Sequence, residues 1–527
     1  MPDSLTVEES PLEMLLQEQR SLQTPVGQFS EQHASIATQS KASFYQQLLP
    51  ISKPKAGEQY AFKVELDKCT GCKACVSACH SLNGLDEHET WRDVGTLSGG
   101  CGDQAYSQTV TTACHHCVDP ACLNGCPVLA YEKDAETGIV RHLDDQCIGC
   151  QYCVLKCPYD VPKYSKKLGI VRKCDLCHSR LAVGEAPACV QACPTEAISV
   201  QIVNQAEQMS AARSGGDFLA AAPDPAYTVP TTHYVSQRTI PEDVHALNQY
   251  AFRPEPTHWP LVWMLLLTQM AAGFFLFDWL FQGPRVLPLL AWSLLLLGLI
   301  ASTTHLGRPL GAWRAFLGLR RSWLSREIAV FSVFFFFASA YVASLLWPQG
   351  FYGLEGYLSL ATTFSGFAGV YCSIMIYVDT QRPFWAGLPT SLRFGGSSLL
   401  FGLLAIGLSR LLSGESVQWI AGLTWLLALL KLGYEAYQVW GPHSRAAKMT
   451  PAKKSAALMR GPLQAILHLR FASAIGFMLL LAPFCFGAQW LLGMGALALL
   501  LLITELSERV LFFRAVAAPK MPGSIDS

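Results

Sequence analysis

Cysteines carry the clearest chemical signal in this chain of 527 residues. Seventeen of the nineteen cysteines lie between Cys69 and Cys193, and sixteen of these form four groups of four. The first and third groups have the spacing CxxCxxCxxxC, which holds [4Fe–4S] clusters in bacterial ferredoxins, and the other two lengthen one gap. A cubane cluster takes one thiolate on each of its four irons, so the sequence predicts four [4Fe–4S] clusters and electron transfer. The groups are Cys69, Cys72, Cys75, Cys79; Cys114, Cys117, Cys122, Cys126; Cys147, Cys150, Cys153, Cys157; and Cys174, Cys177, Cys189, Cys193.

The runs are expected to share their ligands in pairs. One CxxCxxC loop supplies three thiolates, and in two-cluster ferredoxins the fourth cysteine of each run binds the other cluster. A proline follows that fourth cysteine in the ferredoxin pattern, and Pro127, Pro158 and Pro194 occupy this place. His80 takes it in the first run, so the last ligand there departs from the pattern. We expect the first run to pair with the fourth, and the second with the third.

Two other uses of clustered cysteines fit this chain less well. Disulfides are typical of small secreted proteins, and no signal peptide is recognisable at the start of this chain. Structural zinc sites use two CxxC pairs or added histidines rather than repeated three-cysteine loops. Three cysteines lie outside the groups. Cys101, in a glycine-rich stretch, is interpreted as a free loop thiol, and Cys372 and Cys485 as small core residues.

Short strands are expected to position the cysteine loops. Strand-like segments occur at residues 60–66, 138–142 and 197–202, before and after cysteine runs. This is the arrangement of a ferredoxin repeat. The sequence therefore predicts an α+β ferredoxin-like module that nests two cluster pairs about a pseudo-twofold axis.

The chain changes from polar to apolar near residue 257. Long apolar runs follow, each close to the roughly 20 residues that cross a bilayer as a helix. Tryptophans such as Trp259, Trp279 and Trp440 lie near the run ends, as interfacial aromatic residues do. We predict an all-α transmembrane domain of eight helices rather than a large soluble core. The expected spans are about 259–281, 286–304, 327–347, 355–378, 394–412, 417–438, 465–487 and 490–513.

Five segments follow from these patterns. The formal net charge of zero gives no indication of nucleic-acid binding. The predicted segments are 1–57, a partly disordered N-terminal extension; 58–203, the four-cluster domain; 204–257, an extended strap or linker; 258–515, the eight-span membrane anchor; and 516–527, a tail.

The distribution of lysine and arginine indicates which side of the membrane the module occupies. Eight spans put both chain ends on one side, and the loops on that side are 305–326, 379–393 and 439–464. They carry most of the basic residues of the apolar half, whereas the opposite loops offer Arg285 and Arg410. Positive loops stay in the cytoplasm. We therefore expect an integral inner (cytoplasmic) membrane protein with a cytoplasmic cluster module, unless the basic residues bind the module itself or a partner carries it outward.

Ionisable residues at one mouth of the bundle are candidates for a quinone site. His305 ends the second span and Glu327 opens the third, both on the module side, with Arg308 and Arg326 near them. A quinol releases two protons with its two electrons, so its site needs a proton acceptor within hydrogen-bond reach. The alternative for each residue is an interfacial cap or a loop ion pair.

Other ionisable residues in the apolar half have structural interpretations. Lys431 and Glu435 lie four residues apart and are expected to pair with each other on one helix face. Asp278, Glu505, Glu508 and Arg509 lie near span ends and are interpreted as interfacial. Haem b needs paired histidines that face each other across spans, and the available histidines lie near span ends, so no haem is expected. These histidines are His258, His305, His443 and His468.

Specific segments in both halves resemble one known family. Residues 59–203 resemble the four-cluster iron–sulfur subunit of the dimethyl sulfoxide reductase family, and residues 258–515 resemble its membrane anchor. The segments that carry the resemblance in the first half are Cys69–Cys75, Cys114–Cys117 with Pro120–Cys122, Cys147–Cys150 and Lys173–Cys177; in the second half they are His305–Pro309 and Ser322–Glu327. These subunits are usually two chains, and here they look fused.

The resemblance implies more than the spacing does. It implies a separate catalytic subunit with a molybdopterin cofactor, quinol binding at the positions of His305 and Glu327, and an anchor without haem. It also implies an order of clusters from the catalytic subunit to the membrane. That order is Cys69, Cys72, Cys75 with Cys193; Cys174, Cys177, Cys189 with Cys79; Cys147, Cys150, Cys153 with Cys126; and Cys114, Cys117, Cys122 with Cys157. Because no ligand is replaced, four irons are expected in each cluster.

The resulting hypothesis is an electron-transfer and membrane-anchor subunit of a molybdopterin oxidoreductase that lacks the molybdenum site itself. Electrons would pass between menaquinone or ubiquinone and the catalytic partner, as in a dimethyl sulfoxide reductase. Two alternatives remain. The same architecture could act as a dehydrogenase that passes electrons to quinone, for example from sulfite, or it could belong to a polysulfide reductase type of complex. A proton-pumping translocator would want a chain of buried carboxylates or lysines across the spans, and the sequence shows too few. A ferredoxin-type carrier on an inert anchor is the other alternative.

Overall fold

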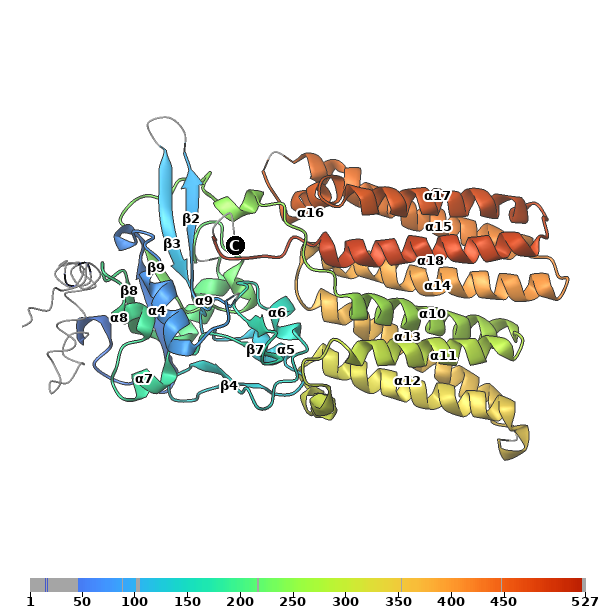
Figure 1. Ribbon diagram of the computed structural model, residues 1–527, viewed down its shortest axis with the longest axis horizontal. Coiled ribbons are helices and arrows are strands. Elements are labelled where there is room, and N and C mark those ends of the chain that lie inside the picture. The colour runs from blue at the N-terminus through green and yellow to red at the C-terminus, as the bar shows by residue number, and fades with distance from the viewer. Residues whose placement is uncertain are drawn as a thin grey trace, which may run out of the picture.

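A computed structural model describes Leu15, Gln17 and residues 46–87, 89–100, 105–215, 218–351, 353–446 and 448–523. The chain forms a module of strands and short helices at one end of a bundle of long, roughly parallel helices (Figure 1). Cys101 and most of the N-terminal extension lie outside the described residues.

The longest module sheet joins the first cysteine run to the last. Strand β1 pairs antiparallel with β8 and parallel with β9, and the side chains of β1 alternate between buried and partly exposed. Because β1 precedes Cys69 and β8 follows Cys193, this pairing brings the first and fourth runs together. The strands of this sheet are β1 (Glu58–Glu65), β8 (Ile198–Asn204) and β9 (His233–Val235).

The other sheets of the module are smaller. Strand β2 pairs antiparallel with both β3 and β10, and two hairpins, β4–β5 and β6–β7, flank the third run. Their bounds are β2 (Asp93–Gly99), β3 (Tyr106–Thr112), β10 (His245–Ala246), β4 (Tyr131–Lys133), β5 (Val140–His142), β6 (Lys163–Ser165) and β7 (Ile170–Arg172).

Each cysteine run folds as a loop followed by a short helix. Gly71 and Gly149 lie inside the first and third loops with φ of 74° and 71°, a left-handed conformation that glycine adopts without steric cost. The helices are α4 (Ala74–Asn83), α5 (Ala121–Gly125), α6 (Tyr152–Lys156), α7 (His178–Ala182) and α8 (Ala188–Gln191), and α9 (Gln205–Arg213) follows β8.

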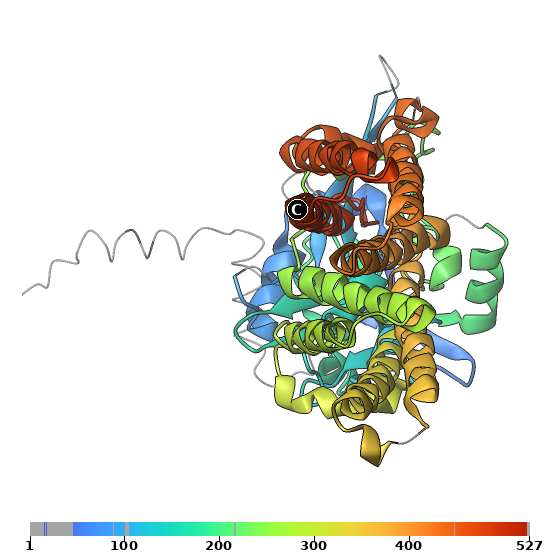
Figure 2. The same ribbon diagram turned by 90° about the vertical axis from the view of Figure 1, so that its right-hand side faces the viewer.

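Within the described residues, eight long helices form the bundle, and a ninth, shorter helix, α16, lies at its module side. Figure 2 shows the long helices nearly end-on, in front of the module. The long helices are α10 (Trp259–Phe281), α11 (Val286–Thr303), α12 (Trp323–Leu346), α13 (Glu355–Val378), α14 (Gly387–Leu412), α15 (Gln418–Trp440), α17 (Gln464–Cys485) and α18 (Leu491–Arg514); α16 is Pro451–Arg460.

Six of these helices are long and apolar enough to cross a membrane: α10, α11, α12, α13, α14 and α17. Large apolar side chains such as Phe364 and Leu479 are exposed on the outside of the bundle, as lipid contact requires. Helices α15 and α18 are of similar length and are not among the six; α15 carries two charged residues and α18 carries four.

The charged residues of α15 and α18 differ from expectation. Lys431 pairs with Glu505, and Glu435 pairs with Arg470, so the expected pair of Lys431 with Glu435 is wrong. Glu505, Glu508, Arg509 and Asp278 are buried rather than interfacial. These residues face the inside of the bundle, where a charge needs a partner from a neighbouring helix.

Two segments outside the module's cysteine runs complete its core. Strands β9 and β10 belong to the strap and extend the two larger sheets. After α18 the chain returns to the module, where Met521 is buried in the same hydrophobic cluster as Phe62 and Val110. The Asn248 side chain donates a 3.0 Å hydrogen bond to the Met521 carbonyl. The module core therefore contains residues from three distant parts of the chain.

Candidate functional site

Three cavities in the module are each lined by four cysteines from two runs. The first and fourth runs line one cavity, and the second and third runs line two. The sets are Cys69, Cys72, Cys75, Cys193; Cys114, Cys117, Cys122, Cys157; and Cys126, Cys147, Cys150, Cys153. In each set the lone cysteine is the fourth of its partner run, which is the exchange expected from the ferredoxin pattern.

The other four cysteines also gather across two runs. Cys79 interacts electrostatically with Cys177 and Cys189, and Cys174 with Cys79 and Cys189. The described residues contain no group of three or more histidine, cysteine or acidic side chains that converges on one metal ion. The cysteines instead surround cavities, which suits a cluster of several irons better than a single ion.

The cysteines have the hydrogen-bond donors that a thiolate ligand needs. All the described cysteines are free thiols. Backbone N–H groups donate to the Sγ atoms of Cys126 at 3.2 Å, Cys193 at 3.3 Å and Cys147 at 3.4 Å. Such donors stabilise negative sulfur and tune the potential of an iron–sulfur cluster. The residues present therefore fit [4Fe–4S] clusters.

Two buried cations lie between the cysteine sets. Arg92 donates from Nη1 to Thr111 Oγ1 at 3.1 Å, and Thr111 Oγ1 lies 3.6 Å from Cys75 Sγ. Lys173 Nζ lies 3.6 Å from Cys114 Sγ and donates to the Cys174 carbonyl at 2.9 Å. Burial opposes the charge of Lys173, but the nearby thiolates outweigh it and raise the pKa of this lysine. Lys173 therefore joins the Cys174 set to the Cys114 set.

The set that contains Cys126 and Cys147 lies against the bundle. Ser325 Oγ donates to the carbonyl of Pro127, which follows Cys126, at 3.4 Å. The Arg308 N–H donates to the carbonyl of Ile148, which follows Cys147, at 3.1 Å. The resemblance placed the Cys114 set nearest the membrane, and that order is wrong for the last two sets. Family likeness assigned the ligands but carried no information on which loop faces the bundle.

Three glycines make a close backbone contact between module and bundle. Gly149 lies in the third cysteine loop, Gly169 in the β6–β7 turn and Gly307 between α11 and α12. A Cβ atom on Gly307 would lie 2.0 Å from the Gly169 carbonyl oxygen, and one on Gly149 would lie 2.9 Å from the Gly307 nitrogen. Side chains at these positions would separate the two parts. The glycine of the segment His305–Pro309 is thus a docking residue.

Basic residues of the bundle loops hold the module by its backbone. Arg308 and Arg314 donate to the carbonyls of Asp144 and Asp145 at 2.8 Å and 2.7 Å. Arg382 donates to the Leu155 carbonyl at 3.0 Å. Part of the positive charge that the sequence shows on this side therefore serves to bind the module.

Helix α6, inside the third run, inserts two side chains into the bundle end. Tyr152 is buried with the bundle core, and its hydroxyl donates to the Ile376 carbonyl at 3.1 Å. Lys156 Nζ forms an ion pair with Asp379 Oδ2 at 2.6 Å, and the Lys156 side chain is 5% exposed. Sequence reasoning missed these residues, although a lysine between two cluster cysteines and an aspartate directly after an apolar span were visible signals.

The four residues predicted for a quinone site lie on the module side of the bundle. Glu327 lies in α12, 4% exposed, and accepts a hydrogen bond from Ser373 Oγ of α13. His305 follows α11; burial lowers its pKa, and its buried Nδ1 has no hydrogen-bond partner among the described residues. Arg326 donates to the carbonyls of Leu319 and Arg320, and Arg308 to the module. The structure shows no hydrogen bond between His305 and Glu327 within the described residues.

Comparison with known proteins agrees with both halves of the fold. Residues 106–203 match the family described as 4Fe-4S dicluster domain, and residues 256–514 match DMSO reductase anchor subunit (DmsC). The B subunit of the anaerobic dimethyl sulfoxide reductase of Escherichia coli (strain K12) is 35% identical over 190 residues, which are 34% of this chain and 87% of that protein. The corresponding subunit of Haemophilus influenzae is 37% identical over 157 residues, covering 28% and 76%. The formate dehydrogenase-O iron-sulfur subunit of E. coli is 35% identical over 158 residues, covering 27% and 52%.

Cysteine-lined cavities docked on a bundle of apolar helices define an iron–sulfur electron-transfer protein that carries its own membrane anchor. It is an integral membrane protein. The chain belongs to the anaerobic dimethyl sulfoxide reductase family, and it joins in one polypeptide the iron–sulfur subunit and the anchor subunit of that family.

Proposed function

We propose that the chain passes electrons between a membrane quinone and a separate molybdopterin-containing catalytic subunit through four [4Fe–4S] clusters. The observation that carries this proposal is the position of Tyr152, which follows Cys150 in the third run and is buried in the core of the bundle that also holds Glu327. Tyr152 lies between Cys150 and Cys153 in the sequence, is buried with the bundle core and interacts electrostatically with Glu327. The electron path and the proposed quinone site therefore meet at α6.

The sixteen cysteines of the four runs are the proposed ligands of the clusters, which supply one-electron chemistry when bound. The proposed order of the sets, each named by one cysteine, runs from the catalytic partner to the bundle as Cys69, Cys174, Cys114 and Cys147. Arg92 between the first two sets and Lys173 between the second and third support this order. The Cys69 set is the proposed contact with the catalytic partner.

His305 and Glu327 are the proposed proton acceptors of the quinone site. A neutral histidine with an unpartnered Nδ1 is able to accept a hydroxyl proton, and Glu327 has one oxygen engaged by Ser373. Arg308 and Arg326 retain N–H groups beyond their carbonyl contacts, and we keep them as proposed contacts of the quinone oxygens. The quinone is menaquinone or ubiquinone.

Substitution of the proposed proton acceptors tests the quinone site. In the complex of this chain with its catalytic partner, E327Q and H305Q are expected to lower quinol-linked turnover by roughly 100-fold, the usual contribution of a positioned acid or base. Turnover with a soluble artificial electron donor is expected to stay unchanged. E415Q, in a glutamate exposed at the far side of the bundle, is the matched control. Full quinol-linked activity of both variants would exclude the site.

Electron paramagnetic resonance tests the cluster number. A redox titration of the full chain is expected to show four [4Fe–4S] centres, and C147S is expected to remove or convert the one nearest the bundle. The quinone-linked reduction of the remaining centres should then slow, because that set is the first to receive electrons from the quinone side. Two or fewer centres in the unaltered chain would contradict the assignment.

The catalytic partner subunit determines the direction of electron flow and the terminal substrate. The relatives are named for dimethyl sulfoxide reduction, which favours quinol oxidation and reduction of a sulfoxide or similar acceptor. A dehydrogenase run in the opposite direction, for example from sulfite, and a polysulfide reductase type of complex are the second candidates, because a formate dehydrogenase subunit has a similar iron–sulfur domain.

We also propose that all eight long helices span the membrane, with the module in the cytoplasm. Helices α15 and α18 match the length of the others, and their charges face inward. Basic residues that do not hold the module, such as Arg320, Arg445 and Lys448, still favour the cytoplasmic side. Reporter fusions in the loop at Gly414, expected on the opposite side, test this topology.

A further inference from the structure

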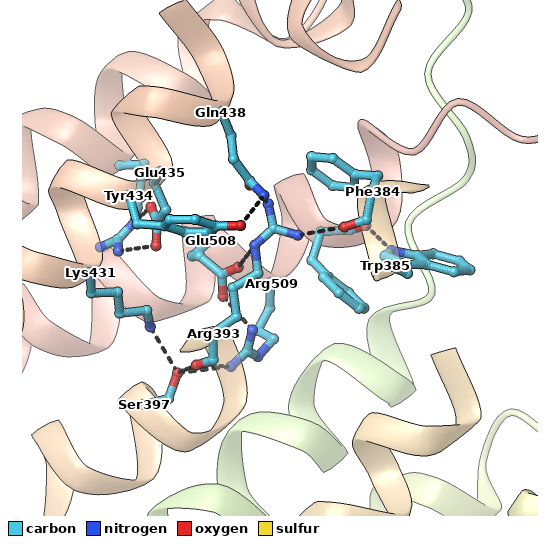
Figure 3. Close-up of polar contacts among 12 residues, drawn as sticks. Phe384, Trp385, Arg393, Ser397, Lys431, Tyr434, Glu435, Gln438, Glu508 and Arg509 are labelled. Atoms are coloured by element: carbon cyan, nitrogen blue, oxygen red, sulfur yellow. Dashed lines mark hydrogen bonds and ion pairs between the residues drawn. The ribbon is translucent and has the colours of Figure 1, made fainter. Parts of the chain in front are cut away.

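Seven charged side chains meet inside one half of the bundle. They come from α14, α15, α17 and α18, and every one of them is buried. Figure 3 shows most of them, with Ser397 and Gln438, pointing toward one another between the helices. The cationic residues are Arg393, Lys431, Arg470 and Arg509, and the anionic residues are Glu435, Glu505 and Glu508.

The contacts divide the arginines and the carboxylates into close pairs. Arg470 binds Glu435 through two N–H groups at 2.9 Å and 2.8 Å. Glu508 pairs with Arg393 at 3.2 Å and also contacts Arg509. Glu505 contacts Lys431 and lies 3.7 Å from Arg470 Nη2, while Lys431 also donates to Ser397 Oγ at 3.0 Å.

The sum of these charges identifies Lys431 as the odd member. Four cations face three glutamates, so the network carries one excess positive charge when every group is ionised, even though Lys431 contacts Glu505 and two arginines share Glu508. A buried uncompensated charge is expensive within a membrane. Arginine keeps its proton in proteins, whereas a buried lysine readily loses it. Lys431 is therefore the cation in this network able to change its charge.

Polar groups connect Lys431 with the module side of the bundle. Gln438 lies two residues before the end of α15, and its carbonyl contacts His443 Nε2 at 2.8 Å, where His443 is partly exposed. Glu435 and Arg470 line a cavity together with Gln438. The cavity has a volume of about 20 Å³, which is enough for one water molecule. Glu505 then links Arg470 to Lys431, which lies nine residues (440 minus 431), or about 14 Å, from the end of α15.

The connection ends at Lys431. On the same four helices, the next ion pair of the described chain toward the far side joins Arg410, in the last turn of α14, to Glu415, which follows that helix and is exposed. An aromatic layer separates the network from Glu327: Tyr377 packs against Phe394 and Phe512, with ring centroids 5.7 Å and 4.9 Å apart. The network is thus a chain of polar groups that reaches the module side of the bundle but not its far side, and it is distinct from the proposed quinone site.

We propose that Lys431 is a proton-loading site inside the membrane domain, filled from the module side. A proton from water enters along Gln438, Glu435 and Glu505 and forms a new N–H bond on the Lys431 amine, and it leaves by the same route. The network charge changes between zero and one positive charge. Ser397 and Arg393 of α14, Glu435 of α15, Arg470 of α17, and Glu505, Glu508 and Arg509 of α18 hold both states. This proton uptake is a function of the anchor beyond quinone binding and electron transfer.

The variant K431R separates this function from a structural ion pair. Arginine preserves the charge and the contact with Glu505 but does not release its proton near neutral pH. The full chain in lipid nanodiscs is stepped from about pH 9 to about pH 7 in weak buffer, and bound protons are counted with a pH-indicator dye. K431R is expected to bind one proton fewer than the unaltered chain. K453R, at a partly buried lysine of α16 that donates to the Ala446 carbonyl and lies outside the network, is the matched lysine control and is expected to leave the count unchanged.

An equal proton count in K431R and the unaltered chain would show that Lys431 is only an ion-pair partner. K431M provides a second variant: three arginines and three glutamates remain balanced, so the bundle is expected to fold and to lose the same proton. Retention of that proton in K431M would also overturn the proposal. The K431R difference is expected to persist in an E327Q background, so failure of the quinone site and failure of the proton site are distinguishable.

Discussion

At the scale of single residues, the segment His305–Pro309 combines two roles. His305 has a buried Nδ1 without a hydrogen-bond partner in the described part of the chain, while Gly307 packs against Gly149 and the Arg308 N–H donates to Ile148 in the third cysteine loop. The proposed quinone contact and the nearest cysteine set are thereby held by the same five residues. A change in docking at this point would also change the distance between the two redox sites.

The substitution G307A tests this docking role. The added Cβ would overlap the Gly169 carbonyl, and relief of such overpacking costs about 1–3 kcal/mol. We expect a lower thermal midpoint of the module and faster limited proteolysis between residues 305 and 322. The control is G395A, in α14, where an added Cβ meets no atom within 4 Å and alanine favours the helix. Equal stability of both variants would contradict the close packing.

At the scale of elements, α6 and the end of α13 form a polar interface between module and bundle, centred on Asp379. Tyr152 and Lys156 reach from α6 to Asp379, and Tyr227 of the strap donates to the Asp379 carbonyl at 2.8 Å. Burial lowers the pKa of Lys156, and the hydrogen bond with Asp379 opposes that effect. The charge of Lys156 therefore depends on the Asp379 carboxylate.

Removal of the Asp379 carboxylate is expected to weaken the interface between α6 and the bundle. D379N leaves Lys156 buried without its counter-ion, which we estimate to cost about 1–3 kcal/mol, because Asp379 is partly exposed. The measurement is the thermal midpoint in detergent, followed by the cluster absorbance. E132Q breaks an exposed ion pair with Arg141 on β4–β5 and is expected to change stability little. A thermal midpoint for D379N as high as that of E132Q would show that the Lys156–Asp379 pair does not stabilise the interface.

The sequence predicts that the long helices exist, but it does not predict the ends of helices whose terminal turns carry buried polar residues. Two predicted spans coincide with α10 and α13, because their apolar stretches extend to both helix ends. Helix α14 begins at Gly387, seven residues before the predicted start, since its first turns carry polar residues such as Arg393 that face the bundle interior. For the same reason α12 begins at Trp323, and Glu327 lies within the helix rather than at its start. Hydropathy reports apolar length and leaves out buried polar turns.

At the scale of the whole molecule, the pairing of the cysteine runs was predictable and their order toward the membrane was not. Ligand exchange between runs follows from the reach of one loop. The position of each set depends on contacts such as Ser325 with Pro127, which join residues almost 200 positions apart. The Lys431 network depends likewise on four helices, so counting ionisable residues along one helix predicted a local pair instead of a shared network.

The return of the C-terminal tail to the module has a consequence for biogenesis. Met521 fills the module core, and the Lys520 ammonium lies 3.7 Å from carboxylates of Asp160 and Glu255. These residues follow the bundle helices in the chain and are therefore synthesised after them. A module that begins to fold early, as domains do during translation, thus lacks part of its core until the anchor is complete. Maturation of the cysteine-rich half and insertion of the anchor are thereby ordered in time by a single short segment.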